Sequence, residues 1–225
     1  MIRGVLFDMD GLLLDTERLG ARILPRLCRE RGYEVPPDLY GRMLGRGYAE
    51  DCQLMRETLG AEFPSEAVLE DFRVTLQSVA RNGGMPVKKG MAACLAGLKE
   101  RGVLRALATS TRRATVELYI RHTPEMQNAL DSLTCGDDVE RGKPAPDIYL
   151  LAARRLGLSP EECLGVEDSL SGLKSLKAAG IAAVMIPDLV EPDERFEGLV
   201  SYRLNHLGQL CGLVDRLNLA PGVRA

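Results

Sequence analysis

The stretch "LFDMDGLLLDTE", residues 6–17, places an apolar run directly before several closely spaced carboxylates. The residues "IRGVLFD" (2–8) are apolar and rich in β-formers, which predicts a short buried strand. Asp8 and Asp10 follow where this strand ends, and their two-residue spacing turns both side chains to the same side of an extended chain. Two like charges this close repel each other, so the sequence predicts a compensating group beside them.

The rest of the chain divides into a helical part and an alternating part. Residues 16–83 carry helical patterns with no strand candidate, whereas from residue 91 onward helices alternate with apolar segments at 103–109, 133–136, 163–167 and 181–187. Such alternation predicts a doubly wound α/β domain, with a parallel sheet covered by helices on both faces. We expect this core domain to comprise 1–15 and 87–225 and the inserted helical domain 16–86, with hinges at 14–16 and 85–89.

Composition excludes several classes of function. The 225 residues carry a formal net charge of −3 with a pI near 5.6, which is not the basic field that attracts nucleic acids. No apolar run approaches the length of a membrane span and no leader pattern opens the chain, so we expect a cytoplasmic protein without a membrane partner. Six cysteines without a C-x-x-C pair and only two histidines leave carboxylates, hydroxyls and lysine as the candidate chemistry. The oligomeric state is not indicated.

Polar side chains follow each predicted strand at its carboxyl end. Asp8 and Asp10 follow the first strand, Thr109 and Ser110 the second, "GDDVERGKPAPD" (136–147) with Lys143 the third, and Glu167 with Asp168 the fourth. Ligands of open parallel sheets bind outside the carboxyl ends of the strands, so we expect these four segments to meet at one edge. Their convergence is a stronger signal than any single motif.

The predicted cluster of acids requires a counter-charge. Asp168 would join Asp8 and Asp10 from a neighbouring strand, and three carboxylates together are unfavourable unless protons or a cation neutralise them. Mg²⁺ prefers oxygen ligands and commonly completes its coordination with water and a substrate phosphate. The sequence therefore predicts a magnesium site that accepts a small phosphorylated metabolite.

Four motifs in this order, "DMDG" (8–11), "ATST" (108–111), "GKPAPD" (142–147) and "VEDS" (166–169), resemble those of the haloacid dehalogenase-like hydrolases. The resemblance covers the whole chain, because the helical insert matches the cap that the family places between its first two motifs. This placement is similar to the subgroup of β-phosphoglucomutase-like proteins and small-molecule phosphatases. The resemblance implies a Rossmann-like core and the hydrolysis of a phosphate monoester.

The family mechanism implies a role for each matching residue. Asp8 would be the nucleophile that forms an aspartyl-phosphate, and Asp10 the acid and base. Thr109 and Lys143 would hold the phosphoryl oxygens, with Ser110 a weaker candidate. The Asp8 carboxylate, the Asp10 carbonyl and Asp168 would ligate Mg²⁺. Glu167 would bind the ion directly or support its ligands, and the alternatives stay open. Asp10 also favours phosphoryl transfer over dehalogenation, because departing halide needs no proton.

Two alternative functions compete with a phosphatase of sugar phosphates or related metabolites. The β-phosphoglucomutases carry a histidine where this chain aligns Gly20 and an arginine where it aligns Ala49, and both departures weaken a mutase assignment. Arg46 in "GRGYAED" (45–51) is the candidate to bind a distal phosphate instead. A receiver-type signalling domain also pairs an acidic cluster with Thr and Lys, but the length, the insert and Asp10 argue against a phospho-accepting switch.

Overall fold

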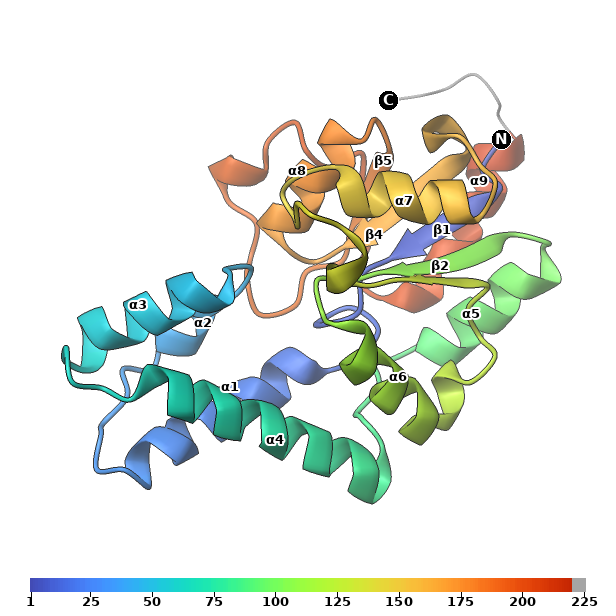
Figure 1. The fold of residues 1–225 in the computed structure, drawn as a ribbon. Helices are drawn as coiled ribbons and strands as arrows, with labels where there is room; N and C mark the ends of the chain where they lie inside the picture. The colour runs from blue at the N-terminus through green and yellow to red at the C-terminus, as the bar shows by residue number, and fades with distance from the viewer. Residues whose placement is uncertain (220–225) are drawn as a thin grey trace.

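A parallel sheet of six strands in the order β3-β2-β1-β4-β5-β6 forms the centre of this computed structural model, which describes residues 1–219 (Figure 1). The strands are β1 (Gly4–Phe7), β2 (Leu104–Ala108), β3 (Ser132–Thr134), β4 (Cys163–Glu167), β5 (Ala182–Met185) and β6 (Tyr202–Arg203). Each neighbouring pair is parallel, and Phe7 of β1 pairs in register with Leu107 of β2 and Val166 of β4. The carboxyl ends of the three central strands therefore lie at the same edge.

Helices cover both faces of this sheet. The helices of the α/β part are α5 (Met91–Glu100), α6 (Arg113–His122), α7 (Asp147–Arg155), α8 (Leu170–Ala178) and α9 (Leu210–Leu219). Side chains alternate along β1, so that Leu6 belongs to the apolar cluster of α7 and α8, whereas Val5 and Phe7 belong to that of α5 and α9. A strand buried on both faces explains why the sequence "GVLF" is continuously apolar.

The four remaining helices form a unit of their own between β1 and α5, called the helical unit below. They are α1 (Thr16–Arg29), α2 (Leu39–Met43), α3 (Tyr48–Leu59) and α4 (Ser65–Gly83), and they lie together beside the sheet in Figure 1. Their facing side chains build a separate apolar cluster that includes Leu24, Met55 and Val68. Because this cluster is distinct from the two at the sheet, the unit has its own packed interior.

Two chain segments connect the helical unit to the sheet, and they pair with each other. The amide of Asp15 donates to the carbonyl of Pro86 at 2.7 Å, and the amide of Lys88 donates to the carbonyl of Leu13 at 2.9 Å. Near the second connection, the amide of Met85 donates to the Thr123 hydroxyl at 3.1 Å, just after α6. These hydrogen bonds fix the helical unit to the sheet beside both connections.

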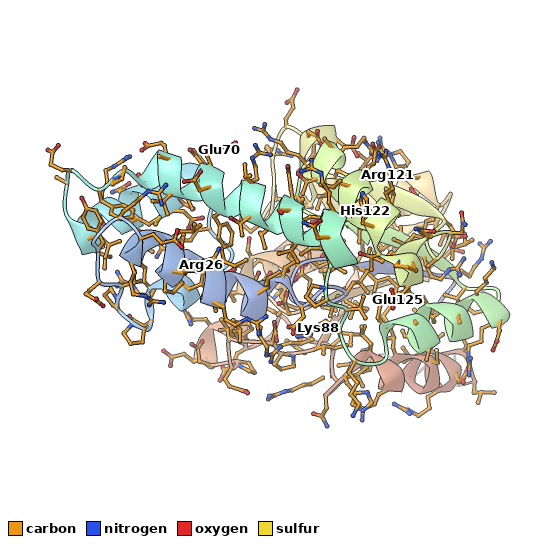
Figure 2. All side chains as sticks on the ribbon, turned by 90° about the horizontal axis from the view of Figure 1, so that it is seen from below. Arg26, Glu70, Lys88, Arg121, His122 and Glu125 are labelled. Carbon is orange, nitrogen blue, oxygen red and sulfur yellow. The ribbon has the colours of Figure 1, made fainter. Side chains whose placement is uncertain are left out.

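Contact between α4 and α6 supports the same side of the helical unit. Figure 2 shows His122, the last residue of α6, beside the C-terminal end of α4. At that end Gly84 has φ +79° and comes so close to the His122 carbonyl oxygen that a Cβ would lie 2.4 Å from it. Glycine at position 84 therefore permits both the turn and the close approach.

The predicted fold class is confirmed: the sheet is parallel, doubly wound and interrupted after its first strand by helices. The third strand, expected at 133–136, is found at Ser132–Thr134, and the two-residue strand β6 was not expected. Within residues 1–219, every helix is too short or too polar to cross a bilayer.

Candidate active site

A cavity of about 1260 Å³ lies between the carboxyl edge of the sheet and the helical unit. The sheet side supplies residues that follow β1, β2, β3, β4 and β5, and the helical unit supplies residues from α1, the α2–α3 region and α4. The predicted residues that line it are Asp8, Asp10, Arg46, Thr109, Ser110, Lys143 and Asp168. Glu167 is fully buried behind this wall.

Lys143 is the group that compensates the carboxylates. Its ammonium donates to Asp8 Oδ1 at 2.5 Å and to Glu167 Oε1 at 2.6 Å, and it lies 4.9 Å from the centre of the Tyr149 ring. Burial alone would lower the pKa of Lys143, but the two carboxylates outweigh that effect and raise it. Lys143 therefore stays charged and bridges the first and fourth strands.

Glu167 is held in place by hydrogen bonds to both of its oxygens. Oε1 also accepts from the Tyr149 hydroxyl at 2.6 Å, and Oε2 accepts from the Ser169 hydroxyl at 2.9 Å and from two backbone amides at 3.2 Å. Burial would raise the pKa of Glu167, but Lys143 outweighs it and keeps this carboxylate ionised. A Cβ on Gly172 would lie 1.7 Å from Oε1, so only glycine leaves room for this arrangement.

Asp10 lies in a different environment, among hydroxyl groups. Its Oδ2 accepts a hydrogen bond from the Thr111 hydroxyl at 2.8 Å, and the backbone amide of Thr111 in turn donates to the Thr109 hydroxyl at 3.1 Å. Burial raises the pKa of Asp10, and the bond from Thr111 opposes this. Because burial favours its protonated form, this carboxyl suits a general acid.

Asp8 and Asp168 carry the part of the negative charge that Lys143 does not fully offset. Burial raises the pKa of Asp8 to about 8 despite the opposing effect of Lys143, and burial together with Glu167 raises the pKa of Asp168 well above its ordinary value. Within residues 1–219 no hydrogen bond is donated to the Asp168 carboxylate. Burial and the neighbouring carboxylates therefore disfavour the charged form of both groups, and a bound cation would favour it.

The donor set fits a hard divalent cation. One oxygen each of Asp8, Glu167 and Asp168 lies within 4.8 Å of the others. Gly11 has φ +78°, and a Cβ there would lie 2.1 Å from Asp168 Oδ2, so the turn after Asp10 leaves this oxygen accessible. Three clustered carboxylates, whose negative charge Lys143 offsets in part, supply the oxygen ligands that Mg²⁺ prefers.

Sequence reasoning missed four residues that contact this site. The Tyr149 hydroxyl donates to Glu167 Oε1. The Thr16 hydroxyl accepts a hydrogen bond from the amide of Gly11 at 3.2 Å, and its hydrogen bond to Asp10 lowers the pKa of that carboxyl. Glu17 and Tyr40 line the cavity from the helical unit, 23 positions apart, and are joined by a hydrogen bond. The only available signal was the acid in "DTE" (15–17) directly after the first connection.

A sequence model of the haloacid dehalogenase-like hydrolase family matches residues 2–180. The chain belongs to this family. It is 32% identical over 186 residues to the "Phosphorylated carbohydrates phosphatase" of Thermotoga maritima. The matched region covers 81% of this chain and 84% of that protein. The predicted family and enzyme class, a phosphoric monoester hydrolase, are confirmed.

Solved structures of other proteins share the architecture of this chain. CbbY from Rhodobacter sphaeroides, solved in complex with xylulose-(1,5)-bisphosphate, superposes with a TM-score of 0.78 at 28% identity over 93% of this chain and 96% of that one. β-Phosphoglucomutase from Clostridium difficile superposes with a TM-score of 0.76 over 97% of this chain and 98% of that one. Its 19% identity shows the fold alone.

Proposed function

We propose that this chain is a Mg²⁺-dependent phosphatase that hydrolyses a small phosphate monoester, a sugar phosphate or a related metabolite, through an aspartyl-phosphate on Asp8. The observation that carries the proposal is the position of Asp8 at the cavity wall, with Lys143 Nζ 2.5 Å from its Oδ1 and an Asp168 carboxylate oxygen within 4.8 Å of one of its own. The names of the relatives, which include a phosphatase of phosphorylated carbohydrates, support the substrate class.

In the first half-reaction, an Asp8 carboxylate oxygen forms a bond to phosphorus while the bond from phosphorus to the ester oxygen breaks. The departing alkoxide takes the proton of Asp10, whose pKa is raised by burial. In the second half-reaction, Asp10 removes a proton from a water molecule whose oxygen forms a bond to phosphorus. The bond from phosphorus to the Asp8 oxygen breaks, which releases inorganic phosphate and the free Asp8 carboxylate. Charge-assisted donation from Lys143, with the hydroxyls of Thr109 and Ser110, would stabilise the phosphoryl oxygens.

The metal would be held by the carboxylates of Asp8 and Asp168 and by the carbonyl of Asp10, with Glu167 at the buried side of the cluster. When bound, Mg²⁺ neutralises charge on the phosphoryl group and orients it for in-line displacement. Because Glu167 already accepts hydrogen bonds at both oxygens, its proposed role is to fix Lys143 and the segment that carries Asp168. The helical unit would act as the cap, with its boundaries at 16–86, and exclude water from the site.

The phosphomutase alternative is less well supported. A mutase needs a partner for Asp10 on the first helix and a second anion clamp, and the space beside Gly20 is filled by the Tyr40 ring. Arg46 lines the cavity but is exposed, and Ala49 carries no charge at the other position. Hydrolysis therefore remains the better assignment, and Arg46 is proposed as a contact for the distal end of the substrate.

The experiment that tests the function measures inorganic phosphate released from a panel of phosphate esters, with and without Mg²⁺. Steady release under excess substrate, lost in EDTA and in Asp8→Asn, is the expected result. A single stable phosphorylation without turnover would instead identify a receiver-like switch. Conversion of β-glucose 1-phosphate with a bisphosphate activator would identify a mutase.

A further inference from the structure

Gly20 and Tyr40 fit together as a pair on the cavity side of the helical unit. Gly20 is a buried residue in the second turn of α1, and a Cβ there would lie 2.0 Å from the Tyr40 hydroxyl oxygen and 2.5 Å from Tyr40 Cζ. Any side chain at position 20 would therefore displace the phenol. The absence of a side chain lets Tyr40, from α2, cross α1 and reach the cavity.

The Tyr40 hydroxyl is used to hold a carboxylate. It donates to Glu17 Oε2 at 3.0 Å, and Glu17 stands one helical turn before Gly20 on the same face of α1. The Tyr40 ring is supported by the ring of Phe72 from α4, at a centroid distance of 6.3 Å. All three side chains line the cavity.

Glu17 has one oxygen left to offer a ligand. Within residues 1–219, Tyr40 is the donor to Oε2, and no hydrogen bond is donated to Oε1. Glu17 lines the same cavity as Asp10, the group that would protonate the departing oxygen. Burial and this nearby carboxyl raise the pKa of Glu17 to about 7. Its Cγ also lies 3.0 Å from the position a Cβ on Gly11 would take, next to Asp168.

We propose that Glu17, positioned by Tyr40, selects the alcohol part of the substrate by accepting a hydrogen bond from a hydroxyl on a carbon next to the phosphate ester. This inference rests on the proposed phosphatase function. An uncharged polyol or sugar satisfies the acceptor, whereas an alkyl chain leaves it unpaired. A carboxylate at that carbon is repelled by Glu17. The substrate class is therefore a phosphate ester of a neutral polyhydroxy compound rather than of a 2-hydroxy acid.

The test compares kcat/KM at pH 8.5, above the Glu17 pKa of about 7, for three esters of similar size: glycerol 3-phosphate, propyl phosphate and phosphoglycolate. The parent protein should prefer glycerol 3-phosphate over propyl phosphate by about 10- to 100-fold, since an unpaired charged acceptor costs about that much. It should discriminate against phosphoglycolate at least as strongly. Glu17→Leu should reduce the first preference to about threefold or less, and Glu17→Gln should mainly increase the relative rate on phosphoglycolate.

Tyr40→Phe separates positioning from packing. It keeps the ring that fills the space at Gly20 and removes the donor to Glu17, so KM for glycerol 3-phosphate should rise about three- to tenfold more than KM for propyl phosphate. Tyr33→Phe is the matched control, because Tyr33 packs on Phe63 within the helical unit and does not line the cavity. Thermal melting of each variant identifies any loss of folded protein.

Two failures are distinguishable in these measurements. Equal kcat/KM for glycerol 3-phosphate and propyl phosphate in the parent, or an unchanged ratio in folded Glu17→Leu, overturns the role of Glu17 and leaves the phosphatase intact. Absence of phosphate release from all three esters and from p-nitrophenyl phosphate overturns the proposed function and this inference with it.

Discussion

Replacement of Lys143 by Met tests whether this ammonium compensates the buried carboxylates. The Lys143 side chain is 6% exposed and bridges Asp8 and Glu167, of which Glu167 is 0% exposed. Loss of one partner from a buried ion pair costs about 3–5 kcal/mol, because a charge remains buried without compensation. We expect a decrease of this size in the unfolding free energy of the metal-free protein at pH 8.

The sign of the pH dependence follows from the carboxylates. In the parent, Lys143 keeps the pKa of Glu167 low, so its stabilising effect is present above the ordinary pKa of a glutamate and is lost as the pH falls through the lowered value. In Lys143→Met the pKa of Glu167 rises. At low pH Glu167 is then protonated in the variant, so that no unpaired charge remains buried there. The deficit should therefore be small near pH 5 and should grow toward pH 8.

Urea denaturation in EDTA at pH 5 and pH 8 measures both quantities, with Lys99→Met on the exposed face of α5 as the control. Phosphate release should fall at least about 10²-fold in Lys143→Met, since a charge-assisted donor to the phosphoryl group is lost. A deficit below about 1 kcal/mol that is equal at both pH values would refute the account of Lys143 as the compensating charge.

Three further predictions follow from the same site. Asp10→Asn should lower turnover by about 10²- to 10⁴-fold, measured by phosphate release, and the loss should be smaller for p-nitrophenyl phosphate, whose leaving group needs less protonation. Asp168→Asn should make the metal-free protein more stable at pH 8, because the charged form of Asp168 is unfavourable in its buried position. The same variant should abolish the increase in Tm that Mg²⁺ gives the parent, and an unchanged increase would contradict the metal site. Burial raises the pKa of Glu17 to about 7, so its ionisation destabilises the metal-free fold as the pH rises from about 4.5 to 7. Glu17→Gln should remove this loss of unfolding free energy, which is at most about 3 kcal/mol. Identical pH profiles of unfolding for the parent and the variant would show that the raised pKa is wrongly assigned to Glu17.

The sheet and the edge where the motifs meet could be predicted because chain order and strand direction determine them. Asp8, Lys143 and Asp168 each lie close to a strand end or in the loop that follows one, and parallel strands bring such positions together whatever the details of packing. The four motifs therefore carried enough information to assemble the acidic wall. No knowledge of side-chain contacts was needed.

Contacts between helices could not be predicted in the same way. Whether Tyr40 reaches Glu17 depends on how α2 crosses α1, and that crossing is set by the whole apolar cluster of the helical unit. Likewise, the hydrogen bond from Tyr149 to Glu167 depends on which face α7 turns to the sheet. The sequence shows only that position 20 lacks the histidine of the β-phosphoglucomutases. The structure shows that the absence of a side chain at Gly20 leaves the space that Tyr40 occupies.

The most direct test of the central claim is mass spectrometry of the protein quenched in acid during turnover. In the presence of Mg²⁺ and a hydrolysed ester, a phosphoryl group should be found on the peptide that contains Asp8, and it should be absent in EDTA and in Asp8→Asn. Phosphate release at the parental rate by Asp8→Asn, with no phosphorylated peptide in either protein, would contradict the account.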